Sequence, residues 1–347
     1  RHDAARLADG LARLFPPQGD GGPDLQRAAA AVAVARGLAV ITGGPGTGKT
    51  TTVARVLALL TEQALAASAA PPRVRLLAPT GKAAARLQAA IAGARDGLDA
   101  DPAVRAALPT EATTLHRALG ARTDGGFARS AGRPLRADVV VVDEASMIDV
   151  ALMRRLVEAV EPAARLILLG DRDQLASIEA GAVLGDVCGP DRPWRPTEDL
   201  AGAVGSDAAA GWPAPDPDPE PASPLAGAVI PLVRSWRFGA DSGIGELARA
   251  INAGNAEATL RILGDGRTDV AWWPTAPPGG DRLAPELAAS AMAGYAAALA
   301  DGPPAERLAA LDGFRVLCAH RRGPDGLERL GPRIEAALAE AGLIRPR

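Results

Sequence analysis

The chain has 347 residues, which is enough for two domains of ordinary size, each with its own core. Its formal net charge is −3 at pH 7, so a globally basic nucleic-acid binder is excluded and any contact with DNA has to be local. Its two cysteines lie far apart without metal-ligand spacing, which argues against a disulfide framework and a zinc site, and no apolar run is long enough to cross a membrane. We therefore expect a protein of the reducing cytoplasm, without membrane contact.

The first 24 residues are rich in alanine and leucine and are then interrupted by proline and glycine. This composition predicts the tail of a preceding domain or a linker (residues 1–24). The chain also starts without methionine and ends on Pro346-Arg347, so we interpret it as a fragment. Residues 25–190 alternate apolar strand-like runs with helical spacing, which predicts an α/β domain whose parallel sheet is covered by helices on both faces.

A phosphate-binding loop follows the first expected strand, residues 37–42. Residues 43–51 read GGPGTGKTT and fit the P-loop pattern G-x-x-x-x-G-K-[ST]. The glycines allow backbone N–H groups to turn around a phosphate, Lys49 supplies a positive charge, and Thr50 offers a hydroxyl to Mg²⁺. We therefore expect the chain to bind ATP with Mg²⁺ through Gly43, Gly44, Pro45, Gly46, Thr47, Gly48, Lys49, Thr50 and Thr51.

Two further helix starts follow expected strands. Thr80, Gly81 and Lys82 come after residues 74–78, and their N–H groups and hydroxyl are suited to a DNA phosphate. Ordinary helix capping by Thr80 is the alternative. Thr114 and His116 lie at a second helix start of the same kind, where packing or capping is the alternative role of His116.

Acidic and amide side chains follow the next two expected strands. Residues 138–142 read DVVVV, a pattern typical of a central parallel strand, and Asp143 and Glu144 come directly after it. Ligands of open α/β sheets bind at such strand ends, so we expect Asp143 to hold Mg²⁺ through water and Glu144 to polarise the attacking water. Gln174 follows the expected strand at 165–169 and is suited to contact the γ-phosphate, with a plain surface turn as the alternative.

The chain changes character after residue 190. Residues 191–228 contain Pro-Asp repeats and small side chains, which predict a flexible insertion. From residue 229 to 347 the pattern predicts order again, with strands at 229–233 and 314–319 and helices at 245–253 and 326–341.

Six sequence blocks resemble the RecD helicases of superfamily 1 in content and in order. They are GGPGTGKTTTV at 43–53, LAPTGKAAARL at 77–87, TLHRALG at 114–120, VVVDEASMID at 140–149, LLGDRDQLASIEAGAVLGD at 168–186 and SWRFGADSGIG at 235–245. The resemblance covers most of residues 25–345. It implies a P-loop NTPase with a first RecA-like lobe at 25–190 and the start of a second RecA-like lobe at 229–347, without the family's later blocks such as V-H-K-[ST]-x-G.

The resemblance also implies roles for single residues. Gln26 would read the adenine edge, although an exposed helical glutamine is the alternative. Arg237 would reach the γ-phosphate across a cleft when two lobes close, and the alternative is a surface arginine stacked on Trp236. Residues 120–137 would form a small hairpin that separates DNA strands, with a plain surface loop as the alternative.

Together with these motifs, the resemblance predicts an ATP-dependent 5′→3′ DNA helicase or translocase. It implies a subunit of a RecBCD-type exodeoxyribonuclease V complex, which acts on single-stranded DNA and DNA ends with RecB- and RecC-like subunits in recombinational double-strand break repair. The alternatives are another superfamily 1 helicase (stand-alone, conjugative or RNA-directed) and a nucleotide-binding scaffold without motor activity. As a fragment, the chain is expected to bind nucleotide, to hydrolyse it slowly and to respond weakly to DNA.

Overall fold

A computed structural model describes residues 2–16, 23–175, 181–189, 193–215, 225, 227–239, 241–273 and 283–345. The internal contacts divide the chain into two compact units, Arg1–Gly245 (unit 1) and Glu246–Arg347 (unit 2). All the residues that the sequence predicts for a functional site fall in unit 1. No helix in the described part of the chain combines the length and the apolarity that crossing a membrane requires.

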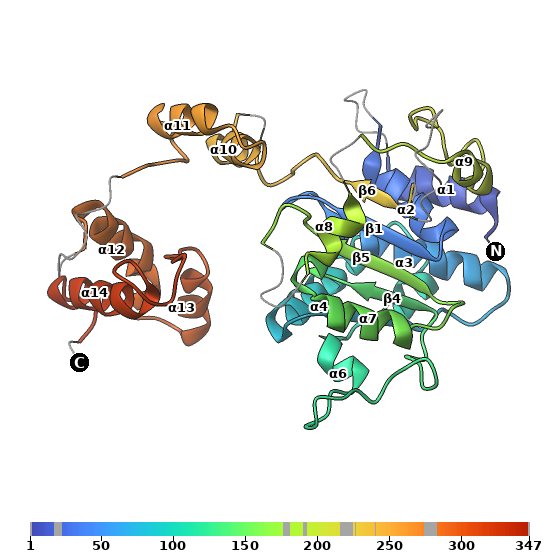
Figure 1. Ribbon diagram of the computed structural model, residues 1–347, viewed down its shortest axis with the longest axis horizontal. Coiled ribbons are helices and arrows are strands. Elements are labelled where there is room, and N and C mark those ends of the chain that lie inside the picture. The colour runs from blue at the N-terminus through green and yellow to red at the C-terminus, as the bar shows by residue number, and fades with distance from the viewer. Residues whose placement is uncertain are drawn as a thin grey trace. The chain divides into compact units, whose positions relative to one another are not determined.

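Unit 1 is built around a six-stranded sheet with the strand order β3-β2-β4-β5-β1-β6 (Figure 1). The strands are β1 (Leu38–Thr42), β2 (Val74–Ala78), β3 (Ala112–Thr114), β4 (Val139–Val142), β5 (Arg165–Gly170) and β6 (Val229–Pro231). Every strand pair is parallel. The carboxyl ends of all six strands therefore lie along one edge, where parallel sheets bind their ligands.

Helices cover both faces of this sheet, because successive side chains of a strand point to opposite sides. On β1, Ala39 and Ile41 pack into one apolar cluster and Val40 into the other. The first cluster joins the sheet to α1 (Ala4–Leu14), α2 (Leu25–Ala35), α3 (Lys49–Ala66), α4 (Gly81–Asp96), α5 (Pro102–Ala107) and α9 (Glu198–Val204). The second joins it to α6 (Leu115–Leu119), the short 3₁₀ turn η1 (Ala145–Met147), α7 (Val150–Ala159) and α8 (Val183–Cys188). The predicted α/β fold of a P-loop NTPase is confirmed.

Helix α1 differs from the linker or tail predicted for residues 1–24. Its side chains Leu7, Leu11 and Leu14 recur at helical spacing and are buried in the first apolar cluster, where α1 packs on α3. Asp3 caps the helix by accepting a hydrogen bond from the backbone N–H of Arg6 at 3.0 Å. Residues 4–15 are therefore part of the core of unit 1, while residues 17–22 lie outside the described residues.

The segment predicted as a flexible insertion, residues 191–228, is also partly ordered. Trp194 and Trp212 pack edge to face with their ring centroids 5.1 Å apart, and Leu200 and Val204 of α9 are buried in the first cluster. Proline, aspartate and alanine dominate the composition of this segment, so these four apolar side chains do not stand out in the sequence. Most of the Pro-Asp stretch, residues 216–224, lies outside the described residues.

The sequence predicts a domain boundary at residue 229, but the boundary between the two units lies later in the chain because strand β6 belongs to unit 1. Its residues Val229, Ile230 and Pro231 pair in register with Val40, Ile41 and Thr42 of β1, so β6 extends the first sheet. The strand predicted at 229–233 thus exists in shortened form, as an edge of unit 1.

Unit 2 is helical in its described residues. It comprises most of α10 (Gly243–Asn252), then α11 (Ala256–Gly264), α12 (Pro285–Leu299), α13 (Pro304–Leu311) and α14 (Leu327–Glu340). The strand predicted at 314–319 is absent, because a strand needs a hydrogen-bonded partner and the described part of this unit contains no other strand. Phe314 packs instead against Tyr295 of α12, with ring centroids 5.0 Å apart. A second RecA-like lobe therefore stays a prediction.

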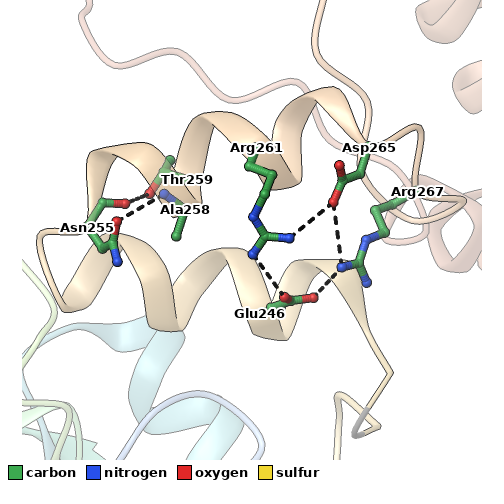
Figure 2. Close-up of polar contacts among 7 residues, drawn as sticks. All are labelled: Glu246, Asn255, Ala258, Thr259, Arg261, Asp265 and Arg267. Atoms are coloured by element: carbon green, nitrogen blue, oxygen red, sulfur yellow. Dashed lines mark hydrogen bonds and ion pairs between the residues drawn. The ribbon is translucent and has the colours of Figure 1, made fainter.

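Charged side chains join α10 to α11 in unit 2 (Figure 2). Glu246 of α10 accepts a hydrogen bond from Arg267 at 2.5 Å and lies 3.9 Å from Arg261 of α11. Asp265 lies 3.6 Å from the same Arg261, and Asn255 caps α11 by accepting from the N–H of Ala258 at 2.9 Å. This network holds the two helices in one hairpin.

Candidate nucleotide and DNA site

The phosphate-binding loop connects β1 to α3 at the carboxyl edge of the sheet. The N–H of Gly43 donates to the carbonyl of Gly170 at the end of β5 at 3.1 Å, which anchors the start of the loop. Gly46 and Gly48 have φ angles of 77° and 83°, in the left-handed region that favours glycine. Helix α3 then begins at Lys49, so the loop ends in a helix N-terminus whose N–H groups suit an anion.

Lys49 points back into this loop. Its Nζ donates to the carbonyl oxygens of Gly43 at 2.5 Å and Gly44 at 3.1 Å. Burial lowers the pKa of Lys49, while the carboxylates of Asp171, Asp143 and Glu144, in that order, oppose this shift. A bound phosphate would compete with the two carbonyls for the same ammonium hydrogens.

Asp143 and Glu144 follow β4, as the sequence predicts. Burial raises the pKa of Asp143, although its Oδ1 accepts a hydrogen bond from the N–H of Glu144 at 2.9 Å. Glu144 has a φ of 52°, a left-handed conformation that is costly for a residue with a Cβ. Residues with a strained backbone cluster at functional sites. Here the strained turn carries two adjacent acidic residues at the end of one strand.

Gln174 lies in the loop that follows β5, and Asp171 holds it there. The Gln174 Nε2 donates to Asp171 Oδ2 at 3.3 Å. Asp171 is only 5% exposed, and sequence reasoning assigned it no role. The available signal was its position directly after a buried strand, which is also the position of Asp143 after β4. The contact of Gln174 with the γ-phosphate stays a prediction.

The other predicted nucleotide residues lie around the loop. Gln26 Nε2 donates to the carbonyl of Thr47 at 2.9 Å, so its side chain engages the loop and is not an unattached helical glutamine. The segment 235–237 lies against the same loop, with Ser235 Oγ donating to the Pro45 carbonyl at 3.2 Å and the N–H of Trp236 donating to the Gly46 carbonyl at 2.8 Å.

Arg237 therefore lies beside the loop within unit 1. A Cβ added to Gly46 would collide with the Cβ of Arg237, and the charge of Arg237 contributes to lowering the pKa of Lys49. The sequence predicts that this arginine reaches the γ-phosphate when two lobes close, and the structure shows it beside the loop without a separate lobe, while its contact with the phosphate stays a prediction. The side chain stacked on the half-exposed Trp236 is Arg234, at 4.2 Å from the ring centroid.

The predicted DNA residues occupy the same edge of the sheet, at the neighbouring strands β2 and β3. These strands pair with Ala78 opposite Thr114, so the starts of α4 and α6 lie side by side. Thr80 and Thr114 each cap their helix, accepting from the N–H groups of Ala83 and Arg117 at 3.2 Å. The capping alternative for Thr80 is therefore real, Thr114 caps its helix in the same way, and each hydroxyl can still donate to a phosphate.

The other residues predicted to bind DNA at this edge are exposed to solvent. Gly81 and Lys82 are exposed at the start of α4, and His116 is exposed on α6 with its ring 6.0 Å from that of Phe127. The segment 120–137 contains two antiparallel bridges, Ala121 with Phe127 and Ser130 with Arg133. It is hairpin-like, although its action on DNA stays a prediction.

Comparison with known proteins agrees with this architecture. Residues 26–180 match the family described as AAA domain, a nucleotide-binding fold. The RecBCD enzyme subunit RecD of Mycolicibacterium smegmatis is 44% identical over 332 residues, which cover 95% of this chain and 52% of that protein. The RecBCD enzyme subunit RecD of Haemophilus influenzae is 39% identical over 73% of this chain and 39% of its own length.

A relative with another name matches a shorter part. The ATP-dependent RecD2 DNA helicase of Deinococcus radiodurans is 42% identical over 42% of this chain and 17% of its own length. The resemblance to RecD helicases is confirmed, and the chain spans about half the length of the RecD subunit from Mycolicibacterium smegmatis.

Proposed function

We propose, from its similarity to RecD subunits, that this chain is the ATP-driven motor of a 5′→3′ DNA helicase or translocase. In this proposal it is a cytoplasmic subunit of a RecBCD-type exodeoxyribonuclease V, works with RecB- and RecC-like partners, and acts on single-stranded DNA and DNA ends during recombinational repair. The chain covers about half of a RecD relative, so strand separation and polarity need a test separate from nucleotide chemistry.

One observation supports the proposal: the groups assigned to phosphoryl transfer follow three adjacent strands of the sheet. β4, β5 and β1 are neighbours in the sheet, and they carry the acidic pair, the Gln174 loop and the P-loop. In this proposal Lys49 and the loop N–H groups bind the β- and γ-phosphates, Glu144 polarises the attacking water, and Gln174 contacts the γ-phosphate. Arg237, beside the loop, stabilises the charge that develops on the phosphoryl oxygens.

Two residues fit a Mg²⁺ ion that accompanies the nucleotide. Thr50 in the first turn of α3 offers a hydroxyl, and Asp143 offers a carboxylate whose burial favours a cation nearby. When bound, the ion would neutralise charge on the phosphates. Hydroxyl and carboxylate oxygens are the ligands that Mg²⁺ prefers, and the chain's own part is to fix these two groups at the start of α3 and after the end of β4.

The DNA side of the proposal rests on the two helix starts beside the nucleotide site. Thr80, Gly81 and Lys82 on α4 and Thr114 and His116 on α6 would bind backbone phosphates through N–H groups, hydroxyls and one ammonium. β2 is hydrogen-bonded to β4. In this proposal a movement of the helices that bind DNA is transmitted through these two neighbouring strands to the acidic pair. Binding of this kind weakens with salt, because each phosphate contact releases counterions.

Two alternatives remain distinct. Another superfamily 1 helicase (stand-alone, conjugative or RNA-directed) would show the same ATP chemistry with a different cargo. A scaffold would bind ATP without DNA-dependent turnover. Neither is favoured by a specific contact in the structure.

The test of the function is strand displacement on matched forks. Forks with a single-stranded 5′ tail or 3′ tail are mixed with the protein, Mg²⁺ and ATP, and the released strand is measured. We expect release only from the 5′-tailed fork and none with Glu144→Gln. Release from the 3′-tailed fork alone would refute the proposed polarity.

A further inference from the structure

Asp171 is the only charged side chain that is deeply buried in the described part of the chain, at 5% exposed. Burying a carboxylate is costly unless hydrogen bonds and a cation compensate for the lost water. Asp171 is the first residue after β5, and the neighbouring strand β4 ends at the acidic pair Asp143 and Glu144. The hydrogen bonds of Asp171 therefore indicate which groups its negative charge stabilises.

Both carboxylate oxygens of Asp171 bond within the loop that carries Gln174. Oδ1 accepts from the N–H of Asp173 at 3.1 Å, and Oδ2 accepts from Gln174 Nε2 at 3.3 Å. The carbonyl of Asp171 also accepts from the N–H of Gln174 at 3.2 Å. The loop is thus wound around this carboxylate, and the orientation of the Gln174 amide depends on it.

Asp171 and Lys49 are connected through the backbone of Gly170 and Gly43. The carbonyl of Gly170, next to Asp171, accepts from the N–H of Gly43, and the carbonyl of Gly43 accepts from Lys49 Nζ at 2.5 Å. Among the acidic groups that oppose the lowering of the pKa of Lys49, Asp171 ranks before Asp143 and Glu144. The charge of Asp171 is thus one of those that favour the charged form of Lys49.

We propose that Asp171 is a positioning residue that holds Gln174 and draws Lys49 toward the P-loop carbonyls, in competition with the γ-phosphate. This inference rests on the proposed ATPase function. A triphosphate has to take hydrogen bonds from both side chains while its own negative charge is repelled by Asp171. After the γ-phosphate leaves, the same carboxylate recaptures Gln174 and Lys49 and favours release of the diphosphate.

The substitution Asp171→Asn separates this role from simple support of the fold. Asparagine keeps an oxygen that can accept from the N–H of Asp173, but it removes the negative charge. We expect affinity for a non-hydrolysable ATP analogue to rise roughly tenfold relative to ADP, the equivalent of about one charge-assisted hydrogen bond. We expect turnover to fall, because the Gln174 amide is no longer held in one orientation.

Asp173→Asn is the matched control. Asp173 is a neighbouring carboxylate in the same loop, its side chain is 53% exposed, and its ion pair with Arg172 is long, at 3.8 Å. Binding of the ATP analogue and of ADP is measured by titration for the wild type and both variants, together with kcat, KM and the melting temperature.

The outcomes are distinct. Tighter ATP-analogue binding with slower turnover in Asp171→Asn alone supports the inference, and the turnover losses of Asp171→Asn and Gln174→Ala should then not multiply in the double variant. Equal weakening of both nucleotides with a lower melting temperature would show a purely structural residue and overturn it, as would wild-type behaviour. A wild type that binds neither nucleotide would instead refute the proposed function itself.

Discussion

The two lysines of the chain provide a paired test of the nucleotide and DNA sites. Lys49 and Lys82 are the only lysines among the 38 basic Lys and Arg residues, so neither can be replaced by another ammonium nearby. Lys49 Nζ makes two hydrogen bonds inside the P-loop, while Lys82 is exposed at the start of α4. Substituting each by alanine should therefore remove one function and spare the other.

The size of the Lys49→Ala effect follows from the contacts that it removes. A hydrogen bond to a charged group contributes about 1.5–3 kcal/mol, which corresponds to a loss of roughly ten- to a hundredfold in nucleotide affinity. Hydrolysis should become undetectable, because the same charge faces the transferred phosphoryl group. Nucleotide titration in Mg²⁺ buffer, followed by a phosphate-release assay, measures both quantities.

Lys82→Ala should leave nucleotide affinity unchanged and weaken binding of single-stranded DNA. The slope of log affinity against log salt should become shallower by about 0.7, because one phosphate contact is lost. Fluorescence anisotropy with a labelled oligonucleotide at several salt concentrations gives this slope. Equal loss of nucleotide affinity in both variants, or an unchanged affinity in Lys49→Ala, would refute the assignment of the two sites.

Three further substitutions test other parts of the account. Glu144→Gln should keep ATP binding and slow hydrolysis by about a hundredfold or more, since it removes the base and leaves the phosphate loop intact; a matching loss of ATP affinity in a titration would contradict this role. Arg237→Ala should lower kcat more than it raises KM in a steady-state assay, and the reverse pattern would indicate a binding role. Glu246→Gln should destabilise the α10–α11 hairpin by about 1 kcal/mol in a denaturant titration, because Arg267 and Arg261 lose a half-buried partner; an unchanged midpoint would show that the network contributes nothing.

Local sequence patterns predict the central strands of the first sheet and the conformation of the P-loop. The β-branched run at 139–142 predicts a central strand because such side chains fit a sheet that is buried on both faces, and β4 is that strand. The P-loop pattern prescribes glycine where φ is positive, and Gly46 and Gly48 have that conformation. Both signals lie within a few neighbouring residues, so they can be read without knowing the tertiary contacts.

The remaining features depend on contacts between distant residues. The sequence of helix α1 predicts a linker, because the packing of its leucine side chains on α3 is visible only in the structure. Strand β6 joins the first sheet by pairing with β1 across nearly 190 residues of sequence. Asp171 looked like one of several polar turn residues, and only its burial distinguishes it from Asp173. The strand expected at 314–319 fails for the same reason, because alternation alone supplies no pairing partner.

The placement of Arg237 changes one expectation about the chain itself. The sequence predicts weak stimulation by DNA because the second lobe lacks its later blocks and Arg237 would rarely be in position. In the structure the segment 235–237 contacts the P-loop through Pro45 and Gly46 within unit 1, so the second of these reasons does not apply.

ATP turnover by the 347-residue chain, measured with and without single-stranded DNA, tests the central claim most directly. The assay needs Mg²⁺, saturating ATP, an oligonucleotide without secondary structure, and Glu144→Gln as the control for contaminating ATPases. We predict turnover in the wild type that rises severalfold when DNA is added and that is lost in the variant. Turnover that is identical with and without DNA, or absent in both, would contradict a DNA-driven motor and favour the nucleotide-binding scaffold.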